Sequence, residues 1–272
     1  MAKRVESPSS INTFKQCPRK YYYQYIEQLP TVPNIHQVRG NIAHSTLEKF
    51  YDLDVSKYGE KNYEQQLKTA IQQLFLCQWN DDYPRLHELN LTKDQLKFYF
   101  EETMLMLMNW VNHFLAELEP VKKKGASLAE AFEKLTPIRE QRYVSEQYSV
   151  QGFIDAIHHL EDGVQIIDYK TNANFEFKDS IKLQLAIYSL LYQEKHGEPP
   201  SKVGIFFLRH KLKLMKVDQD LLDLAIKEIE LIHAYTSIME GKTDYPQNIT
   251  PLCKWSTGQC DFYEACKPHD NS

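Results

Sequence analysis

The chain has 272 residues, of which 42% are hydrophobic, and a formal net charge of -5, so it can bury a full core in one large domain or two small ones. The acidic balance excludes a general attraction to nucleic acid, and any such role must rest on local basic patches and on a site. No stretch approaches the roughly 20 apolar residues that span a bilayer, and the N-terminus lacks the apolar core of a secretory signal, so we expect a cytoplasmic protein.

The first half of the chain is predicted to be mainly helical. Ser9 or Ser10 can cap a short helix that ends near Cys17, because the residue that follows is a proline. Residues 41–52 have the apolar spacing of an amphipathic helix, and residues 61–118 form a long stretch with apolar side chains at helical intervals. We interpret this long stretch as part of a helical insertion.

The second half of the chain combines strands and helices. Residues 143–157 alternate between polar and apolar, and residues 164–170 are apolar and rich in β-branched side chains. A helix is predicted over 180–195 and a buried strand over 203–208, so the strands on either side of this helix should be parallel and joined by a right-handed crossover. The remaining predicted elements are a strand over 212–217, a helix from Asp218 to about Gly241 and an irregular tail from Tyr245.

An Asp162-Gly163 pair between the first two strands predicts a tight two-residue turn. With this register Asp155 faces Lys170, and Asp168 lies two residues from Lys170 on the same face of the sheet. A slip by one residue would separate these groups. Two neighbouring carboxylates repel each other unless a divalent cation such as Mg2+ binds them, and a lysine beside the cation can orient an attacking water. The alternative is an Asp–Lys ion pair on a solvated face.

Four segments of the sequence form an ordered set that spans almost the whole chain. They read Ser-Ser-Ile-Asn-Thr-Phe-Lys-Gln-Cys-Pro-Arg-Lys-Tyr at 9–21, Arg-Gly-Asn-Ile-Ala-His at 39–44, Gly-Phe-Ile-Asp with Ile-Asp-Tyr-Lys-Thr at 152–155 and 167–171, and Gln-Leu-Ala-Ile-Tyr at 184–188. Together they resemble the PD-(D/E)XK nucleases of the RecB/AddB type, a group that includes the CRISPR-associated RecB-like exonucleases. The resemblance implies an α/β restriction-endonuclease-like core, with a central mixed sheet flanked by helices, that cleaves DNA with Mg2+ or Mn2+.

The resemblance also implies a catalytic set. Its members are His44, Asp155, Asp168, Lys170, Gln184 and Tyr188. The histidine and the two aspartates would bind metal together with the backbone carbonyl of Tyr169, and the lysine would position the water. The glutamine and the tyrosine match the family's QxxxY motif, one helical turn apart. Without the motifs, a lone histidine on a helix is more often structural than a ligand, the glutamine could merely bridge, and the tyrosine could belong to the core. Glu146 also lies near the first strand, where we expect it to be solvated or ion-paired.

Three of the five cysteines crowd into the last 20 residues, at Cys253, Cys260 and Cys266, with the spacing C-x6-C-x5-C. In a reducing compartment such clustering favours a metal or iron–sulfur site over disulfides. The resemblance implies that Cys17 and these three cysteines hold a 4Fe-4S cluster, although the family's C-terminal spacing is often C-x2-C-x5-C. Four thiolates also suit tetrahedral zinc, so zinc stays the alternative. Either group would join the first helix to the tail.

The predicted organisation has three parts. Residues 1–30 and 242–272 form an iron–sulfur lobe, residues 31–60 and 136–241 form the nuclease core, and residues 61–135 form the helical insertion, which could roof the cleft and thread a single strand. The candidate DNA contacts are Arg19, Lys20 and Arg39, with solvated or buttressing roles as the alternatives.

We therefore predict a metal-dependent DNA exonuclease that acts on single-stranded ends by two-metal-type phosphodiester hydrolysis. Its setting would be DNA repair and recombination, with repair-helicase proteins as partners, or CRISPR spacer acquisition, with integration proteins as partners. The alternative is a non-catalytic DNA-end-binding or scaffold module of a larger nuclease complex, against which the intact acids and lysine argue.

Overall fold

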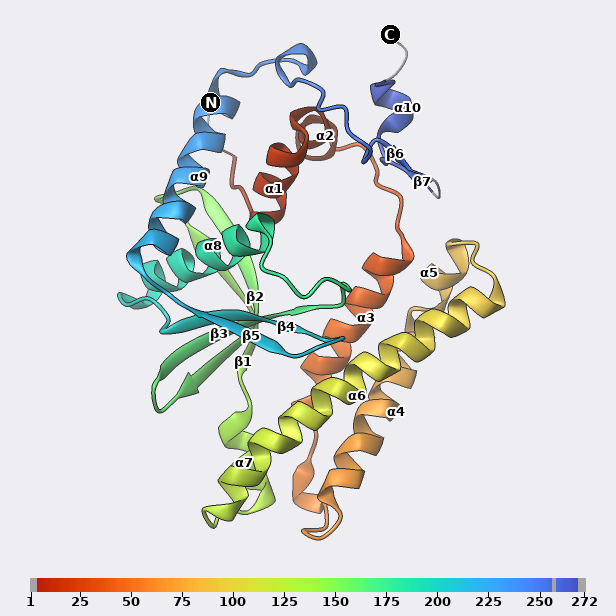
Figure 1. Cartoon of the computed structure of the whole chain (residues 1–272), viewed down its shortest axis with the longest axis vertical. Helices are drawn as coiled ribbons and strands as arrows, with labels where there is room; N and C mark the ends of the chain where they lie inside the picture. Colours follow the sequence, from red (N-terminus) through yellow and green to blue (C-terminus); the bar gives the residue numbers. More distant parts are fainter. Residues whose placement is uncertain (1–3, 256–257, 269–272) are drawn as a thin grey trace.

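A computed structural model of the chain describes residues 4–255 and 258–268. In this part of the chain, the central sheet has five strands in the order β1-β2-β3-β4-β5. They are Ile138–Ser145 (β1), Val150–Leu160 (β2), Gly163–Lys170 (β3), Lys202–Phe207 (β4) and Leu212–Lys216 (β5). The β3–β4 pair is parallel and the other neighbours are antiparallel. The predicted mixed sheet and the parallel pairing of the strands on either side of the 180–195 helix are therefore confirmed, and helices cover both faces (Figure 1).

One face of the sheet is covered by the first helix and the two longest C-terminal helices (Figure 1). These are α1 (Pro8–Gln16), α8 (Asp179–His196) and α9 (Gln219–Ile238), the last followed by a short 3-10 turn η3 (Lys242–Asp244). Their apolar side chains join Ile166, Val203 and Ile205 of the sheet in one buried cluster. This cluster holds α8 against the strands, with its Gln184 and Tyr188 facing the sheet side.

The helices of the predicted insertion cover the opposite face. They are α4 (Tyr63–Asp81), α5 (Tyr83–Glu88), α6 (Lys93–Lys123) and α7 (Leu128–Leu135), and they pack with α3 (Ile35–Phe50) and a 3-10 turn η2 (Val55–Lys57). Their buried side chains share one hydrophobic cluster with Ile167, Tyr169 and Phe206 of the sheet. The insertion therefore packs as part of the central core. In the described part of the chain, no helix is long and apolar enough to cross a membrane.

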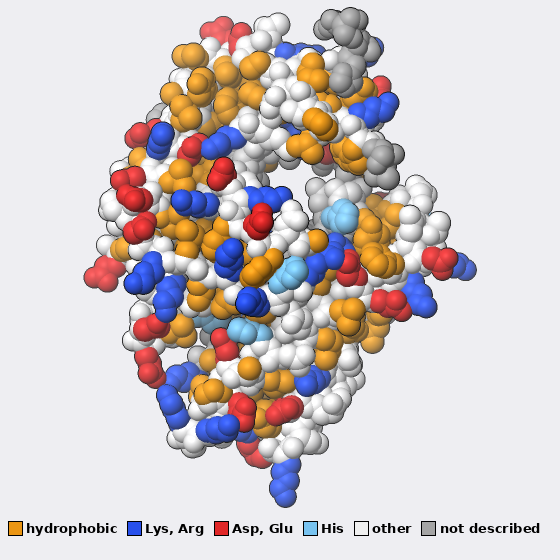
Figure 2. Space-filling model, in the orientation of Figure 1, with side chains coloured by type: hydrophobic (Ala, Val, Ile, Leu, Met, Phe, Trp, Pro, Cys, Tyr) orange, Lys and Arg blue, Asp and Glu red, His pale blue; other side chains and the backbone are white. Residues whose placement is uncertain are grey.

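Segments from the two ends of the chain form a terminal lobe, which we define as residues 17–26, 245–255 and 258–268. Its elements are α2 (Pro18–Tyr21), a π-helical turn η1 (Tyr22–Ile26), β6 (Lys254–Trp255), β7 (Gly258–Gln259) and α10 (Tyr263–Cys266). Asn248 donates to the Gln16 carbonyl at 2.8 Å, and the Tyr23 hydroxyl donates to the Ala265 carbonyl at 2.8 Å. Figure 2 shows the surface deeply hollowed between this lobe and the part of the molecule built by the sheet, α3 and α6.

Two helix starts differ from the sequence predictions. The N-cap of α1 is Ser7, whose hydroxyl accepts from the Ser10 amide at 3.1 Å, while Cys17 ends the helix as predicted. The helix predicted over 41–52 starts earlier, because Asn34 caps it and accepts from the Gln37 amide at 3.1 Å. A reciprocal capping box stabilises each start.

The register predicted for the first hairpin is wrong. Leu160 pairs with Gly163, so the turn consists of Glu161 and Asp162, and Ala156 pairs with Ile167. Gly163 is needed for a different reason, since a Cβ there would lie 2.8 Å from the Ser201 hydroxyl oxygen and its φ is +120°. Continuing this register places Asp155 level with Asp168 instead of Lys170.

Candidate active site

The strands β2 and β3 part at one end of the hairpin, and the site forms where they part. The last paired residues at this end are Ala156 and Ile167, which are the direct neighbours of Asp155 and Asp168 in the sequence. The carboxylate of Asp155 accepts a hydrogen bond from the freed Tyr169 amide at 2.8 Å. This contact replaces a backbone hydrogen bond that the sheet no longer provides. It also fixes the carboxylate next to the Tyr169 carbonyl.

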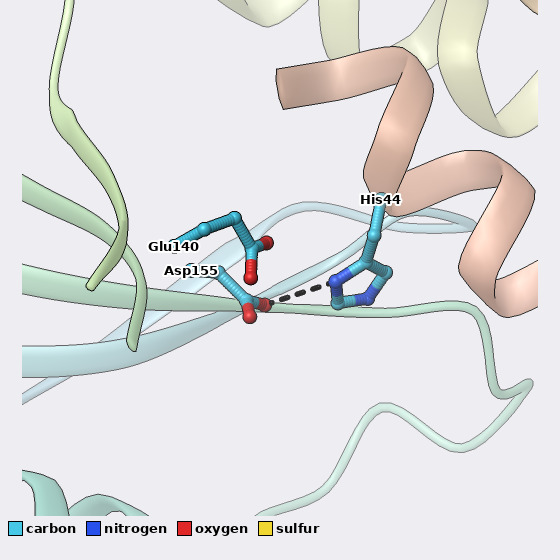
Figure 3. Close-up of side chains that lie close together, drawn as sticks. All are labelled: His44, Glu140 and Asp155. Atoms are coloured by element: carbon cyan, nitrogen blue, oxygen red, sulfur yellow. Dashed lines mark ion pairs between the residues drawn. The ribbon is translucent and has the colours of Figure 1, made fainter. Parts of the chain in front are cut away.

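Helix α3 brings His44 to this point. His44 Nδ1 lies 3.3 Å from Asp155 Oδ2, and Figure 3 marks this ion pair with a dashed line. His44 Nε2 lies 2.9 Å from the Tyr169 carbonyl oxygen. Burial lowers the pKa of His44, but the hydrogen bond and charge of Asp155, with the charge of Asp168, outweigh it and raise the pKa to about 9. Three of the four groups predicted as metal ligands therefore meet.

Asp168 is held by α8, which covers the face of the sheet opposite to α3. Its side chain is 3% exposed, Gln184 donates to Oδ1 at 2.8 Å, and the Lys170 ammonium lies 2.9 Å from Oδ2. Gln184 also donates to the Tyr188 hydroxyl at 2.8 Å. Burial, joined by the nearby charge of Asp155, raises the pKa of Asp168 to about 6 despite the neighbouring lysine. The charge of Asp155 therefore acts on a buried carboxylate, and a nearby cation would offset this repulsion.

Tyr188 reaches the sheet because β2 carries a glycine beneath it. A Cβ at Gly152 would lie 2.9 Å from Tyr188 Cε1 and 3.1 Å from Leu191 Cδ1, closer than side chains normally approach. The first residue of the Gly-Phe-Ile-Asp segment therefore provides the space for the tyrosine of the QxxxY pair. The resulting contact sets the depth of α8 over the site, and so the position of Gln184.

Glu140 belongs to the site, and the sequence did not indicate it. It lies in β1 between two paired residues, Arg139 opposite Ala156 and Gln141 opposite Ile154, so that it stands across from Asp155. Ligand atoms of His44, Glu140 and Asp155 all lie within 4.8 Å of one another (Figure 3). Burial, then the charge of Asp155, raises the pKa of Glu140 to about 7.

The backbone of Glu140 has φ +47°, in the left-handed region. Such a conformation costs a non-glycine residue about 1–3 kcal/mol and clusters at functional sites. The polar run around Glu140 hides β1 from a search for alternating apolar residues, since strong alternation begins only at residue 143. Glu146, the acid weighed from the sequence, is exposed in the β1–β2 turn, as expected.

The donor set of this site suits a hard divalent cation. It contains carboxylates, a backbone carbonyl and an imidazole, which are ligands that Mg2+ or Mn2+ accepts. The four cysteines predicted to act together lie elsewhere, in the terminal lobe, so none of them competes here as a soft sulfur ligand. The residues present therefore fit the predicted metal, and a candidate metal centre exists at this end of the hairpin.

The predicted DNA contacts have different surroundings. Arg39 is 2% exposed, forms an ion pair with Glu102, and stacks over the Tyr99 ring at 5.1 Å. The structure thus gives Arg39 a buttressing role between α3 and α6, the alternative weighed from the sequence. Arg19 donates to the Tyr245 carbonyl at 2.8 Å, and Lys20 lines the cavity of the terminal lobe. DNA contact by Arg19, Lys20 and Arg39 stays a prediction.

The four cysteines predicted to act together line one cavity of about 250 Å³ in the terminal lobe. They are Cys17, Cys253, Cys260 and Cys266. Burial raises the pKa of the Cys260 and Cys266 thiols. Among the described residues, no three of these sulfurs lie within 4.8 Å of one another, whereas a tetrahedral zinc ion holds its sulfurs about 3.8 Å apart.

A mixed α/β sheet whose strands part around two aspartates, beside a lysine and a histidine, is an arrangement that suits divalent-cation-dependent hydrolysis of phosphodiesters. The chain belongs to the PD-(D/E)XK nuclease superfamily, whose sequence profile matches residues 6–267. The resemblance and the fold class inferred from the sequence are therefore confirmed.

Three relatives match parts of the chain. The CRISPR-associated exonuclease Cas4 of Francisella tularensis subsp. novicida (strain U112) is 25% identical over 176 residues, 62% of this chain and 85% of that protein. An ATP-dependent helicase/nuclease subunit of Clostridium botulinum (strain Alaska E43 / Type E3) is 29% identical over 60% of this chain and 12% of its own length. An ATP-dependent helicase/deoxyribonuclease subunit of Streptococcus uberis (strain ATCC BAA-854 / 0140J) is 26% identical over 74% of this chain and 18% of its own length. The chain thus spans most of the first relative and less than a fifth of the other two.

Proposed function

We propose that this protein is a cation-dependent DNA exonuclease that acts on the ends of single strands. The observation that carries the proposal is the meeting of His44, Asp155, the Tyr169 carbonyl, Asp168 and Lys170 where β2 and β3 part. The relatives named above as an exonuclease and a deoxyribonuclease support DNA as the substrate.

The residues of the site divide the chemistry. His44, Asp155, Asp168 and the Tyr169 carbonyl would hold the Mg2+ or Mn2+, in one or two positions. The bound cation supplies Lewis acidity toward the phosphoryl group and a more acidic water. The Lys170 ammonium orients the attacking water and offsets the negative charge that develops on the phosphate.

Gln184 and Tyr188 act on this chemistry through Asp168. Gln184 connects the Tyr188 hydroxyl to Asp168 Oδ1, with 2.8 Å at each step. The hydrogen bond keeps the carboxylate oriented when a substrate phosphate approaches. Both residues are therefore positioning residues in this proposal.

The shape of the molecule supports action on single strands with a free end. The surface is hollowed between the terminal lobe and the part that carries α3 and α6 (Figure 2). A single strand can enter such a confined space end first, whereas a strand without ends must be bound from the side. Threading would favour removal of nucleotides from an end.

Linear and circular single-stranded DNA of the same sequence separate this proposal from its rivals. With Mn2+, we expect linear end-labelled strands to be shortened stepwise and the circle to remain intact. Labelling the linear strand first at one end and then at the other gives the direction in which the nucleotides are removed. Rapid cutting of the circle would make the protein an endonuclease, and no cutting of either substrate would favour the DNA-end-binding or scaffold module.

The biological setting follows from two sets of relatives and is also a proposal. Similarity to a CRISPR-associated exonuclease favours spacer acquisition with integration proteins as partners. Similarity to helicase/nuclease proteins favours repair with a helicase as partner. This chain covers only 12% and 18% of those two relatives. In this setting the helicase activity would therefore come from outside the 272 residues of this chain.

We also propose that the cysteine cavity holds a 4Fe-4S cluster with a structural role. The four cysteines line one cavity, the resemblance favours iron over zinc, and metal binding there would tie α1 to the tail. Anaerobically purified protein should be brown and contain about four iron atoms per chain. Replacing Cys260 with serine should remove the colour and lower the midpoint of thermal unfolding, while the exposed Cys77→Ser should change neither. Colourless protein that contains zinc would contradict the proposal.

A further inference from the structure

We propose that Glu140 is a ligand of the cation held by His44 and Asp155. This inference rests on the proposed function and adds a carboxylate from β1 that the sequence motifs do not contain. The three side chains come from three elements, since Glu140 lies in β1, Asp155 in β2 and His44 in α3. A ligand set assembled this way exists only in the folded chain.

The geometry places the Glu140 carboxylate at the cation position. Ligand atoms of Glu140, Asp155 and His44 lie within 4.8 Å of one another, which is the spread expected for ligands of one cation bound at about 2.0–2.5 Å. Figure 3 shows the two carboxylates side by side, with the imidazole facing them. A hollow of about 10 Å³ lies among the same residues, with Tyr169 also lining it. A space of this size suits one small ion or one water.

A second observation points to a positively charged ligand here. Asp168 is 2% exposed, and its Oδ2 accepts no hydrogen bond of regular geometry although Lys170 Nζ is 2.9 Å away. The negative charges of Asp155 and Asp168 both act on Glu140. The carboxylates of Glu140 and Asp155 repel each other, the nearby charge of Asp168 adds to this repulsion, and binding of a divalent cation would remove it.

Glu48 provides a matched comparison in the same surroundings. It lies one turn after His44 on α3, lines the same hollow and adds its negative charge to the surroundings of Glu140. Its carboxylate, however, does not belong to the group of three ligands. Glu48→Gln therefore replaces a carboxylate beside the same hollow, as Glu140→Gln does, without removing a proposed ligand.

The test is a Mn2+ titration of the full chain without DNA, followed by the loss of the electron paramagnetic resonance signal of free Mn2+. We expect Glu140→Gln to raise the Kd for Mn2+ by at least about tenfold, as loss of even an indirect partner of a metal ligand does. Glu48→Gln should stay within about threefold of wild type. Glu140→Gly should lose affinity like Glu140→Gln and remain folded, because glycine adopts φ +47° without strain. Thermal unfolding without metal checks the folding of each variant.

Each outcome of this titration decides the role of Glu140. An unchanged Kd for Glu140→Gln, or an equal loss for Glu48→Gln, would show that only local charge matters and would overturn the inference. Failure of the wild type to bind Mn2+ would overturn it as well. If the wild type binds Mn2+ and the variant binds weakly, but the wild type digests no DNA, the ligand role stands and the proposed function fails.

Discussion

Replacing Lys170 with alanine is expected to slow DNA hydrolysis by about 10³-fold, because in the proposed function this ammonium offsets the negative charge that develops on the phosphate. Its side chain is 30% exposed, so it reaches both Asp168 at 2.9 Å and the space open to substrate. The Gln184 hydrogen bond to Asp168 remains in the variant. Mn2+ affinity should therefore change much less than the hydrolysis rate, measured on end-labelled single strands.

Lys202→Ala is the matched control for this prediction. Lys202 lies at the other end of the same strands and pairs with Asp162 at 2.6 Å, with 34% of its side chain exposed. It thus has the same chemistry and similar exposure outside the site. The control should digest DNA at the wild-type rate. Hydrolysis by Lys170→Ala at the rate of the control would mean that the proposed catalytic centre is wrong.

Replacing Glu102 with glutamine is expected to lower the free energy of unfolding by about 3 kcal/mol, since it leaves a buried arginine without its counter-charge. Glu102 on α6 binds two arginines, Arg39 from α3 and Arg209 from the turn after β4. Arg209 also donates to the Thr171 carbonyl at 3.0 Å, one residue after Lys170. The loss of this ion-pair network should therefore also reduce the hydrolysis rate, because it loosens the end of β3.

Urea unfolding measures this effect, with Glu101→Gln as the control. Glu101 precedes Glu102 on the same helix, but its partner Lys97 is 3.8 Å away and both side chains are more than half exposed. Such a surface pair contributes at most about 0.5 kcal/mol. Equal unfolding free energies for the two variants would show that the Glu102 network does not stabilise the docking of α6.

Much of the secondary structure follows from local signals in the sequence. The helix predicted over 180–195 is observed as Asp179–His196, and Gly197, at φ +84°, ends it. The strand predicted over 203–208 is observed as Lys202–Phe207. Apolar periodicity and helix-ending residues are properties of short segments, so they survive in the folded chain. The single strand predicted over 143–157 is wrong, since this range holds the end of β1, a turn and most of β2. The first half of β1 escaped prediction, because it is polar and its Glu140 has a backbone conformation unusual for a strand.

The hairpin shows how an incorrect detail can leave a site intact. The predicted turn was displaced by one residue, so Asp155 lies level with Asp168 and not with Lys170. This displacement moves the partner of Asp155 by two positions along β3. Because the side-chain direction in a strand repeats every two residues, the same groups still meet. If the partner of Asp155 had moved by only one position along β3, these groups would have been separated.

The sequence by itself determined the order of the elements, the family and the residues of its motifs, Asp155, Asp168, Lys170, His44, Gln184 and Tyr188, because motifs and periodicity are written in short stretches of chain. The tertiary structure decided what depends on contacts between distant segments. It joined His44 to Asp155 across the face of the sheet, buried Arg39 against Glu102, and brought Glu140 beside His44 and Asp155 at the candidate metal centre. The two aspartates and the lysine had a local reason to meet in one hairpin, whereas Glu140 had none, since only the pairing of β1 with β2 places its carboxylate beside theirs.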